Sequence, residues 1–195
     1  MTELEQMEYD KGIRAKRMML WFGIISLIMS FAAFTSAFLV SSGSDDRWID
    51  NFSLPTAFFW STGVIILSSI SMYFAFKYVK NEQRSLGMAF LFITLILGLT
   101  FMGLQLFGFN QIMTELGYYF TGETSNITYT YIFLIAAVHV LHVAAAVIAL
   151  GVVIYNHYKQ RYNKEQTLGI ELAATFWHFV DLLWIYLFCF LYFVR

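Results

Sequence analysis

The sequence is poor in charged residues, in cysteine and in proline. Of its 195 residues, 13% are charged and 59% are hydrophobic, whereas soluble domains carry about 25% charged and roughly 45–50% apolar residues. So little polar surface cannot cover a water-soluble globule, and we expect the chain to reside in a membrane. With 12 Lys+Arg against 13 Asp+Glu, the chain lacks the basic surface that binds nucleic acid, which we exclude as a partner.

The scarce residue types also restrict the local structure. The single cysteine, Cys189, excludes an internal disulfide and a thiolate metal cage, and we expect it to pack among aromatic residues. The single proline, Pro55, stands where a helix would begin, a position at which its missing N–H costs nothing. Gly98, Gly103 and Gly108 lie five residues apart in one apolar run and are expected to allow close helix packing.

Five apolar runs are long enough to cross about 30 Å of hydrocarbon, which takes roughly 20 helical residues each. They cover residues 18–40, 55–79, 86–109, 129–155 and 170–194. Membrane-spanning β-strands would be about 10 residues long and strictly alternating, a pattern that the chain lacks. We predict an all-α fold, in which residues 1–195 form one integral membrane bundle of five transmembrane helices.

The positive charges predict the orientation of this bundle. Ten Lys and Arg residues precede the first run, lie at the end of run two or between runs two and three, or lie between runs four and five, whereas only Arg47 and Arg195 fall on the other side. Positive charge in short loops is retained in the cytoplasm, which places the N-terminus in the cytoplasm and the C-terminus outside. Residues 1–17 do not resemble the start of a cleaved signal peptide, and we expect a solvated tail there.

Few ionisable residues lie deep in the apolar runs. His139 and His142 lie in the fourth run, and His178 and Asp181 lie in the fifth; the spacing of three residues places each pair on one helix face. Ionisable side chains inside membranes face the bundle interior and usually have partners. We expect these four residues to form a structural polar cluster, in which Asp181 hydrogen-bonds a histidine across the interface of helices four and five.

A metal or haem site is the alternative interpretation, because an H-x-x-H pair with a third histidine and an aspartate could supply four ligands. Di-iron bundles draw acidic ligands from four helices, whereas the first three runs contain no intramembrane acid or histidine. We therefore favour the polar clamp and expect no metal or cofactor on this chain. For Gln105, a buried hydrogen bond is favoured over ligand contact, and His157 is expected to be solvated.

Several motifs carry a resemblance to a known family. Residues 177–184 read W-H-F-V-D-L-L-W, which resembles the signature of cytochrome c oxidase subunit III. Residues 139–143, H-V-L-H-V, followed by Gly151, are similar to the H-G-L-H-V-x-x-G stretch of that family, and residues 98–105 match its G-x-x-F-x-x-x-Q. Leu54-Pro55 matches the L-P that opens its second span. The similarity covers essentially the whole chain and fits the short five-helix bacterial form.

The resemblance implies a non-catalytic subunit of a cytochrome c or quinol oxidase in the bacterial inner membrane. It implies direct packing against subunit I, haems and copper on partner subunits, and further partners in subunit II, small subunits or a respiratory supercomplex. The family binds phospholipid between helices and sustains proton uptake and stable turnover during oxygen reduction. On this basis Glu171, Trp177 and Gln105 are candidates for contact with lipid or a neighbouring subunit.

Two carboxylates common in the family are absent from this chain. Leu27 follows Ser26 where the family commonly has glutamate, and Gly108 replaces a second glutamate three residues after Gln105. A proton-handling role attached to those carboxylates does not carry over. Two alternative functions stay open: a subunit III-like accessory protein of nitric oxide reductase, and a stand-alone membrane haem or metal protein that uses the His/Asp cluster.

Overall fold

The computed structural model describes residues 3–43, 48–49, 54–115, 117, 126–160 and 167–194. Within these ranges the chain forms five helices: α1 (Glu3–Ser42), α2 (Thr56–Lys80), α3 (Arg84–Glu115), α4 (Ile127–Tyr158) and α5 (Leu168–Val194). All five are long and apolar enough to cross a membrane. The predicted all-α class and the five spans are confirmed, and the chain is a multi-pass membrane protein.

The helices cover all five predicted runs and extend past most of their ends. α2 begins directly after Pro55, whose carbonyl oxygen accepts a hydrogen bond from the backbone N–H of Phe58. α1 differs most, because it begins at Glu3 rather than near Met18. The preceding segment is largely exposed, as expected of a solvated tail, yet it is helical. It is rich in Glu, Gln, Lys, Arg and Met, which favour helix even outside hydrocarbon.

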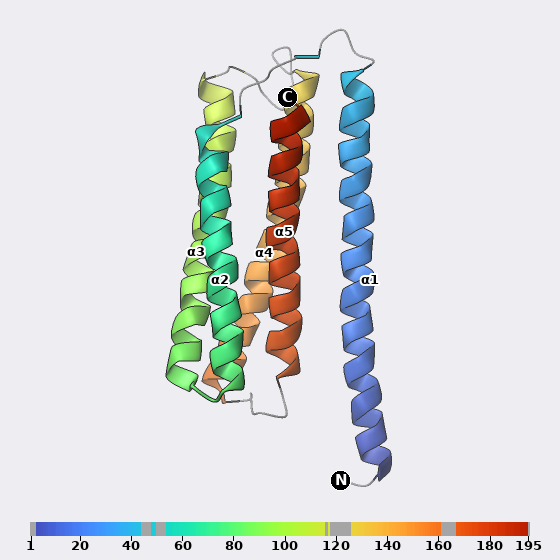
Figure 1. Cartoon of the computed structure of the whole chain (residues 1–195), viewed down its shortest axis with the longest axis vertical. Helices are drawn as coiled ribbons and strands as arrows, with labels where there is room; N and C mark the ends of the chain where they lie inside the picture. The colour runs from blue at the N-terminus through green and yellow to red at the C-terminus, as the bar shows by residue number, and fades with distance from the viewer. Residues whose placement is uncertain are drawn as a thin grey trace.

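Successive helices run in opposite directions, so α1 begins and α5 ends at opposite ends of the bundle (Figure 1). The lower end in Figure 1 holds the start of α1 and the turn between α2 and α3, and this turn carries Lys77, Lys80 and Arg84. The described positive charges therefore gather at one end. That this end lies in the cytoplasm stays a prediction. The prediction also used four residues that lie outside the described part of the chain: Arg47, Arg161, Lys164 and Arg195.

The helices pack unequally against one another. α2 and α3 form a close hairpin, α4 and α5 pack against this hairpin, and α1 contacts only α4 and α5 in the described part of the chain. In the most apolar 18-residue stretch of α1, 22% of the residues are buried, against 39% in α2, α4 and α5. α1 therefore stands at the side of a four-helix block (Figure 1).

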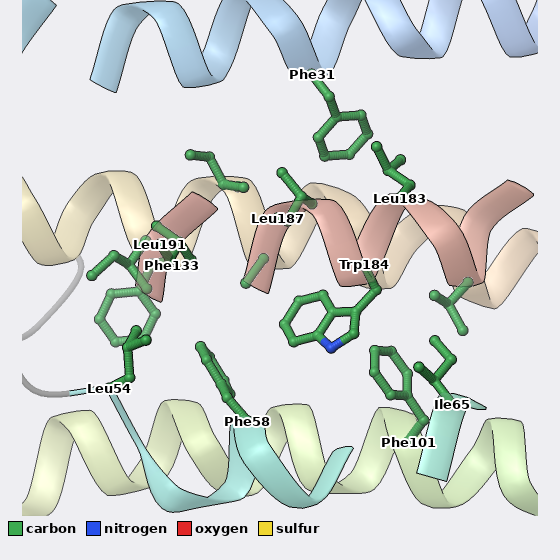
Figure 2. Close-up of a cluster of buried hydrophobic side chains, with 14 of the residues drawn as sticks. Phe31, Leu54, Phe58, Ile65, Phe101, Phe133, Leu183, Trp184, Leu187 and Leu191 are labelled. Carbon is green, nitrogen blue, oxygen red and sulfur yellow. The ribbon is translucent and has the colours of Figure 1, made fainter. Parts of the chain in front are cut away.

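The core of the block is centred on Trp184 of α5, which is fully buried. Phe58 of α2 and Phe101 of α3 meet its ring edge-on, with centroid separations of 5.6 and 5.3 Å. Edge-to-face contacts at this distance are favourable for aromatic pairs. Figure 2 shows Trp184 directed toward Phe58 and Phe101, while Phe31 reaches toward the block from α1.

Two glycines of α3 make room for aromatic rings of neighbouring helices. A Cβ atom at Gly98 would lie 2.7 Å from the ring of Trp177, and one at Gly108 would lie 2.6 Å from the ring of Phe58. The predicted packing role is therefore confirmed at these two positions, whereas a Cβ at Gly103 would meet nothing within 4 Å. Because Phe58 fills the space beside Gly108, the glutamate common in the family would have to displace that ring.

Candidate functional site

The four ionisable residues that we expected to cluster fall into two groups with different partners. His139 and His142 of α4 both contact the ring of Phe31 on α1. His178 and Asp181 of α5 instead share Ser69 of α2. Each pair shares a helix face, but the pairs do not converge on a common ligand position. Among the described residues, no group of three or more His, Cys, Asp or Glu side chains is placed to hold a metal ion.

Ser69 of α2 lies beside both His178 and Asp181 of α5. Its Oγ lies 2.7 Å from Nδ1 of His178, and it neighbours the Asp181 carboxyl. A hydroxyl both donates and accepts, so Ser69 can pair with either tautomer of the imidazole. The three side chains thus form a polar chain between α5 and α2, 10 to 13 residues into α5.

The two histidines of α4 belong to the aromatic packing. His139 is fully buried, and neither of its ring nitrogens has a hydrogen-bond partner among the described residues. Its ring packs against Trp184 and Phe101, with centroid separations of 5.1 and 6.0 Å. His142 is half-buried, and its Nδ1 lies 2.7 Å from the carbonyl oxygen of Val138, one turn earlier in α4.

The predicted hydrogen bond between Asp181 and a histidine of α4 is not formed. Asp181 lies beside Ser69 of α2, and its buried Oδ2 has no hydrogen-bond partner in the part of the chain that the structure describes. Asp181 also lines a cavity of about 10 Å³ between the helices. The reason for the difference is the rotation of α5, which places the Trp184 ring, rather than the Asp181 carboxyl, against His139.

Hydroxyl groups of α2 are the polar partners that sequence reasoning missed. The indole nitrogen of Trp177 donates to the Ser68 hydroxyl over 3.0 Å, and that of Trp184 donates to the Thr62 hydroxyl over 3.1 Å. A repeat in the sequence could have revealed them. The Ser-Thr pair that contains Thr62 recurs seven residues later as the Ser-Ser pair that begins at Ser68, and the two tryptophans are also seven residues apart. Seven residues are two helical turns, so both sets line the facing surfaces of antiparallel helices.

Gln105 and Trp177 are enclosed by the bundle. Gln105 is fully buried, and its Nε2 donates to the Ser61 hydroxyl over 2.8 Å, which confirms the expected buried hydrogen bond. Trp177 is 3% exposed and packs on Gly98. This placement differs from the expected contact with lipid or another subunit. Hydroxyl groups of α2 bond the amide nitrogen of Gln105 and the indole nitrogen of Trp177, while Oε1 of Gln105 is buried without a partner among the described residues.

Glu171 is the candidate that lies at the surface. Its Oε2 accepts a hydrogen bond from Nη2 of Arg17 over 3.0 Å, and the two side chains are 38% and 50% exposed. This ion pair joins the first turn of α5 to α1. Sequence reasoning identified Glu171 but not its partner, which lies 154 residues away along the chain.

A groove of about 420 Å³ runs between α1 and α5. Ile28 and Ala32 contribute to its α1 wall, and Phe179 and Leu182 contribute to its α5 wall. Tyr186 is the polar residue of the lining, and its hydroxyl lies 3.3 Å from that of Thr35. The groove is therefore lined by apolar side chains along its length, as expected for a surface that contacts the hydrocarbon of a membrane.

Two further sequence predictions are wrong. The sequence predicts a solvated His157, whereas this residue is 7% exposed and its Nε2 lies 3.2 Å from the carbonyl oxygen of Arg84. The cause is the length of α4, which continues beyond the predicted span and meets the start of α3. Cys189, expected to pack, is exposed on α5.

Comparison with known proteins extends these observations. Residues 5–195 match the family model for cytochrome c oxidase subunit III. The chain is 25% identical over 165 residues to cytochrome c oxidase subunit 3 of Bacillus subtilis, covering 83% of this chain and 78% of that protein. It is 27% identical over 188 residues to cytochrome bo(3) ubiquinol oxidase subunit 3 of Buchnera aphidicola, covering 94% and 89%. With its whole helical bundle inside the match, the chain belongs to the cytochrome c oxidase subunit III family.

Proposed function

We propose that this chain is the third core subunit of a haem-copper terminal oxidase in the inner membrane of a bacterium. The match to the family over residues 5–195 is the observation that carries the proposal. The similar proteins of Bacillus subtilis and Buchnera aphidicola are subunits of a cytochrome c oxidase and of a ubiquinol oxidase. Both electron donors are therefore compatible with the similarity.

In this proposal the chain is non-catalytic and acts through its partners. Subunit I packs directly against it, the haems and copper reside on partner subunits, and subunit II, small subunits or a supercomplex complete the assembly. The use of the buried polar groups supports a structural role, because Trp177, Trp184 and Gln105 are each bonded to hydroxyl groups of α2. The N-terminus lies in the cytoplasm, on the side of the clustered Lys and Arg residues.

The groove between α1 and α5 is the proposed site for a phospholipid. Its apolar walls suit an acyl chain, and the half-exposed Arg17 offers a positive charge for a phosphate. Arg17 precedes Ile28 of the groove by eleven residues, which is about 16 Å along the helix. A lipid can span that distance with its phosphate at the interface and its chain in the groove.

The chain is proposed to sustain proton uptake and stable turnover without the two carboxylates common in the family. Leu27 and Gly108 occupy their positions, and Phe58 fills the space beside Gly108. Support for turnover is therefore assigned to the way the bundle holds its partner and its lipid, and not to a buried acid on α1 or α3.

Purification of the tagged chain in mild detergent, followed by identification of partners, tests this function. We expect a haem-copper subunit I to be recovered with oxygen-uptake activity. Recovery of nitric oxide reductase subunits would favour the accessory-protein alternative. A lone, colourless protein would count against any role in an oxidase, and a Soret band on the isolated chain would favour a stand-alone haem protein.

A further inference from the structure

We infer that one lateral surface of the bundle, formed by α2 and α5, binds a transmembrane helix of the partner subunit through a hydrogen bond to His178. This surface, the α2/α5 face, consists of Ile66, Ile70 and Tyr73 of α2 and His178, Cys189 and Tyr192 of α5. The inference rests on the proposed function, because the oxidase supplies the partner. Beyond that function, the inference names the side of the chain that the partner covers and the hydrogen bond that joins them.

His178 is a polar residue of this face with one ring nitrogen that the described residues leave unbonded. It lies ten residues into α5, about 15 Å from the helix start, which is deep in the hydrocarbon. The side chain is half-buried, and its Nδ1 is bonded to Ser69. In the described part of the chain, its Nε2 has no hydrogen-bond partner and is not among the enclosed polar atoms.

Lipid cannot satisfy this nitrogen. Acyl chains carry no hydrogen-bonding group, and phosphate head groups remain at the interface, about 15 Å from His178 along the helix. A polar side chain at this depth therefore faces protein or a water-filled cavity in an assembled membrane protein. We assign this position to a transmembrane helix of a neighbouring subunit.

The hydrogen bond to Ser69 determines which groups that helix can offer. The Ser69 hydroxyl either accepts from Nδ1–H of His178 or donates to an unprotonated Nδ1. A neutral imidazole then presents Nε2 as an acceptor in the first case and as an N–H donor in the second. The partner helix therefore presents a side chain that both donates and accepts, such as a hydroxyl or an amide.

The surroundings of His178 fit a helix in shape as well as in chemistry. Ile66, Ile70 and Tyr73, which lie within four residues of Ser69 on α2, are 44% to 55% exposed and add apolar surface beside the histidine. Gly63 lies one turn before Ile66 and two turns before Ile70 on the same side of α2, and a Cβ there would meet no atom of the described residues within 4 Å. Small residues at such positions let a second helix approach closely.

Site-specific photocrosslinking in the complete membrane complex tests the face. Ile70→p-benzoylphenylalanine places the probe on the α2/α5 face, and Ile93→p-benzoylphenylalanine is its matched control. Both isoleucines lie nine to ten residues from the α2–α3 turn, and they are 49% and 45% exposed. We expect a covalent adduct with the catalytic subunit from Ile70 and none from Ile93.

The outcomes separate this inference from the proposed function. Copurification of the chain with a haem-copper subunit I, with adducts to that subunit from Ile93 and only lipid or quinone adducts from Ile70, overturns the inference and leaves the function intact. If no oxidase subunit copurifies with the unsubstituted chain, the function fails and the inference fails with it.

Variants of His178 test the hydrogen bond itself. We expect His178→Ala to lose the partner during detergent extraction, and His178→Gln to retain it because an amide both donates and accepts hydrogen bonds. His142→Ala, a change at the other half-buried histidine, should retain the partner. Equal retention in His178→Ala and the unsubstituted complex would overturn the proposed bond, and adducts from Ile70 report whether the altered chain still folds and docks.

Discussion

The helix α1 and the four-helix block of α2 to α5 are held by different kinds of contact. In the block, aromatic rings pack against glycines of α3, and indole and amide groups donate hydrogen bonds to hydroxyls of α2. The contacts that attach α1 include the Phe31 and Phe38 rings, the Thr35 and Ser41 hydroxyls with Tyr186 and Tyr131, and the Arg17 ion pair.

This difference indicates where the bundle can adapt. Lipid tails are as apolar as side chains, so helices associate in membranes through close packing and hydrogen bonds rather than through the hydrophobic effect. The block has both in its centre, whereas α1 has a single buried stripe and a groove beside it. We therefore expect α1 to separate from α5 more easily than any helix of the block separates from its neighbours.

Phe31→Ala should have the largest effect and should be confined to α1. The same truncation costs about 3–5 kcal/mol in water-soluble cores, and we expect a smaller loss here because lipid solvates the exposed surface. Hydrogen exchange should accelerate along α1 and stay unchanged in α2 to α5. Equal acceleration in all helices would show that α1 and the block form one cooperative unit.

Gly98→Ala should destabilise the block. The new methyl group would lie 2.7 Å from the Trp177 ring, which is fixed by its bond to Ser68, and overpacking of this kind typically costs about 1–3 kcal/mol. The thermal midpoint in detergent should fall. Gly103→Ala is the matched control on the same helix, because its methyl group meets no atom within 4 Å, and it should leave the midpoint unchanged or slightly higher.

Gln105→Leu should weaken the contact between α2 and α3 to a smaller extent. It removes the bond to Ser61, and interhelical hydrogen bonds in membranes average about 0.6 kcal/mol. Thr100→Val, which removes an exposed hydroxyl bonded within α3, is the control. Unfolding of both variants in mixed detergent measures the difference, and an equal effect in both would contradict a special role for Gln105.

Arg17→Gln should have the smallest effect on stability. Exposed ion pairs contribute about 0–1 kcal/mol and are screened by salt, so the thermal midpoint should change little and not at all at high salt. The same variant should reduce phospholipid retained after purification, measured by lipid extraction and phosphate analysis. Unchanged retention would exclude Arg17 as the head-group contact.

Much of the fold was predictable, because each span must satisfy its own backbone hydrogen bonds in lipid and so forms a long apolar helix. The rotation of each helix was not predictable in this way. Asp181 faces α2 rather than α4 because the Trp184 ring packs against His139. His157 is buried because α4 continues beyond the predicted span. Such contacts join residues that are distant in sequence, and hydropathy carries no information about them.

The polar chain through Ser69 has a consequence for how the protein is made. On insertion scales, an aspartate at the centre of a helix costs about 2.5–3.5 kcal/mol, so α5 enters the bilayer at a disadvantage relative to an all-apolar span. The Ser69 hydroxyl that bonds His178 is synthesised 109 residues before it. The polar side chains of α2 and α5 therefore cannot meet until the last helix has been made, and the block closes only at the end of synthesis.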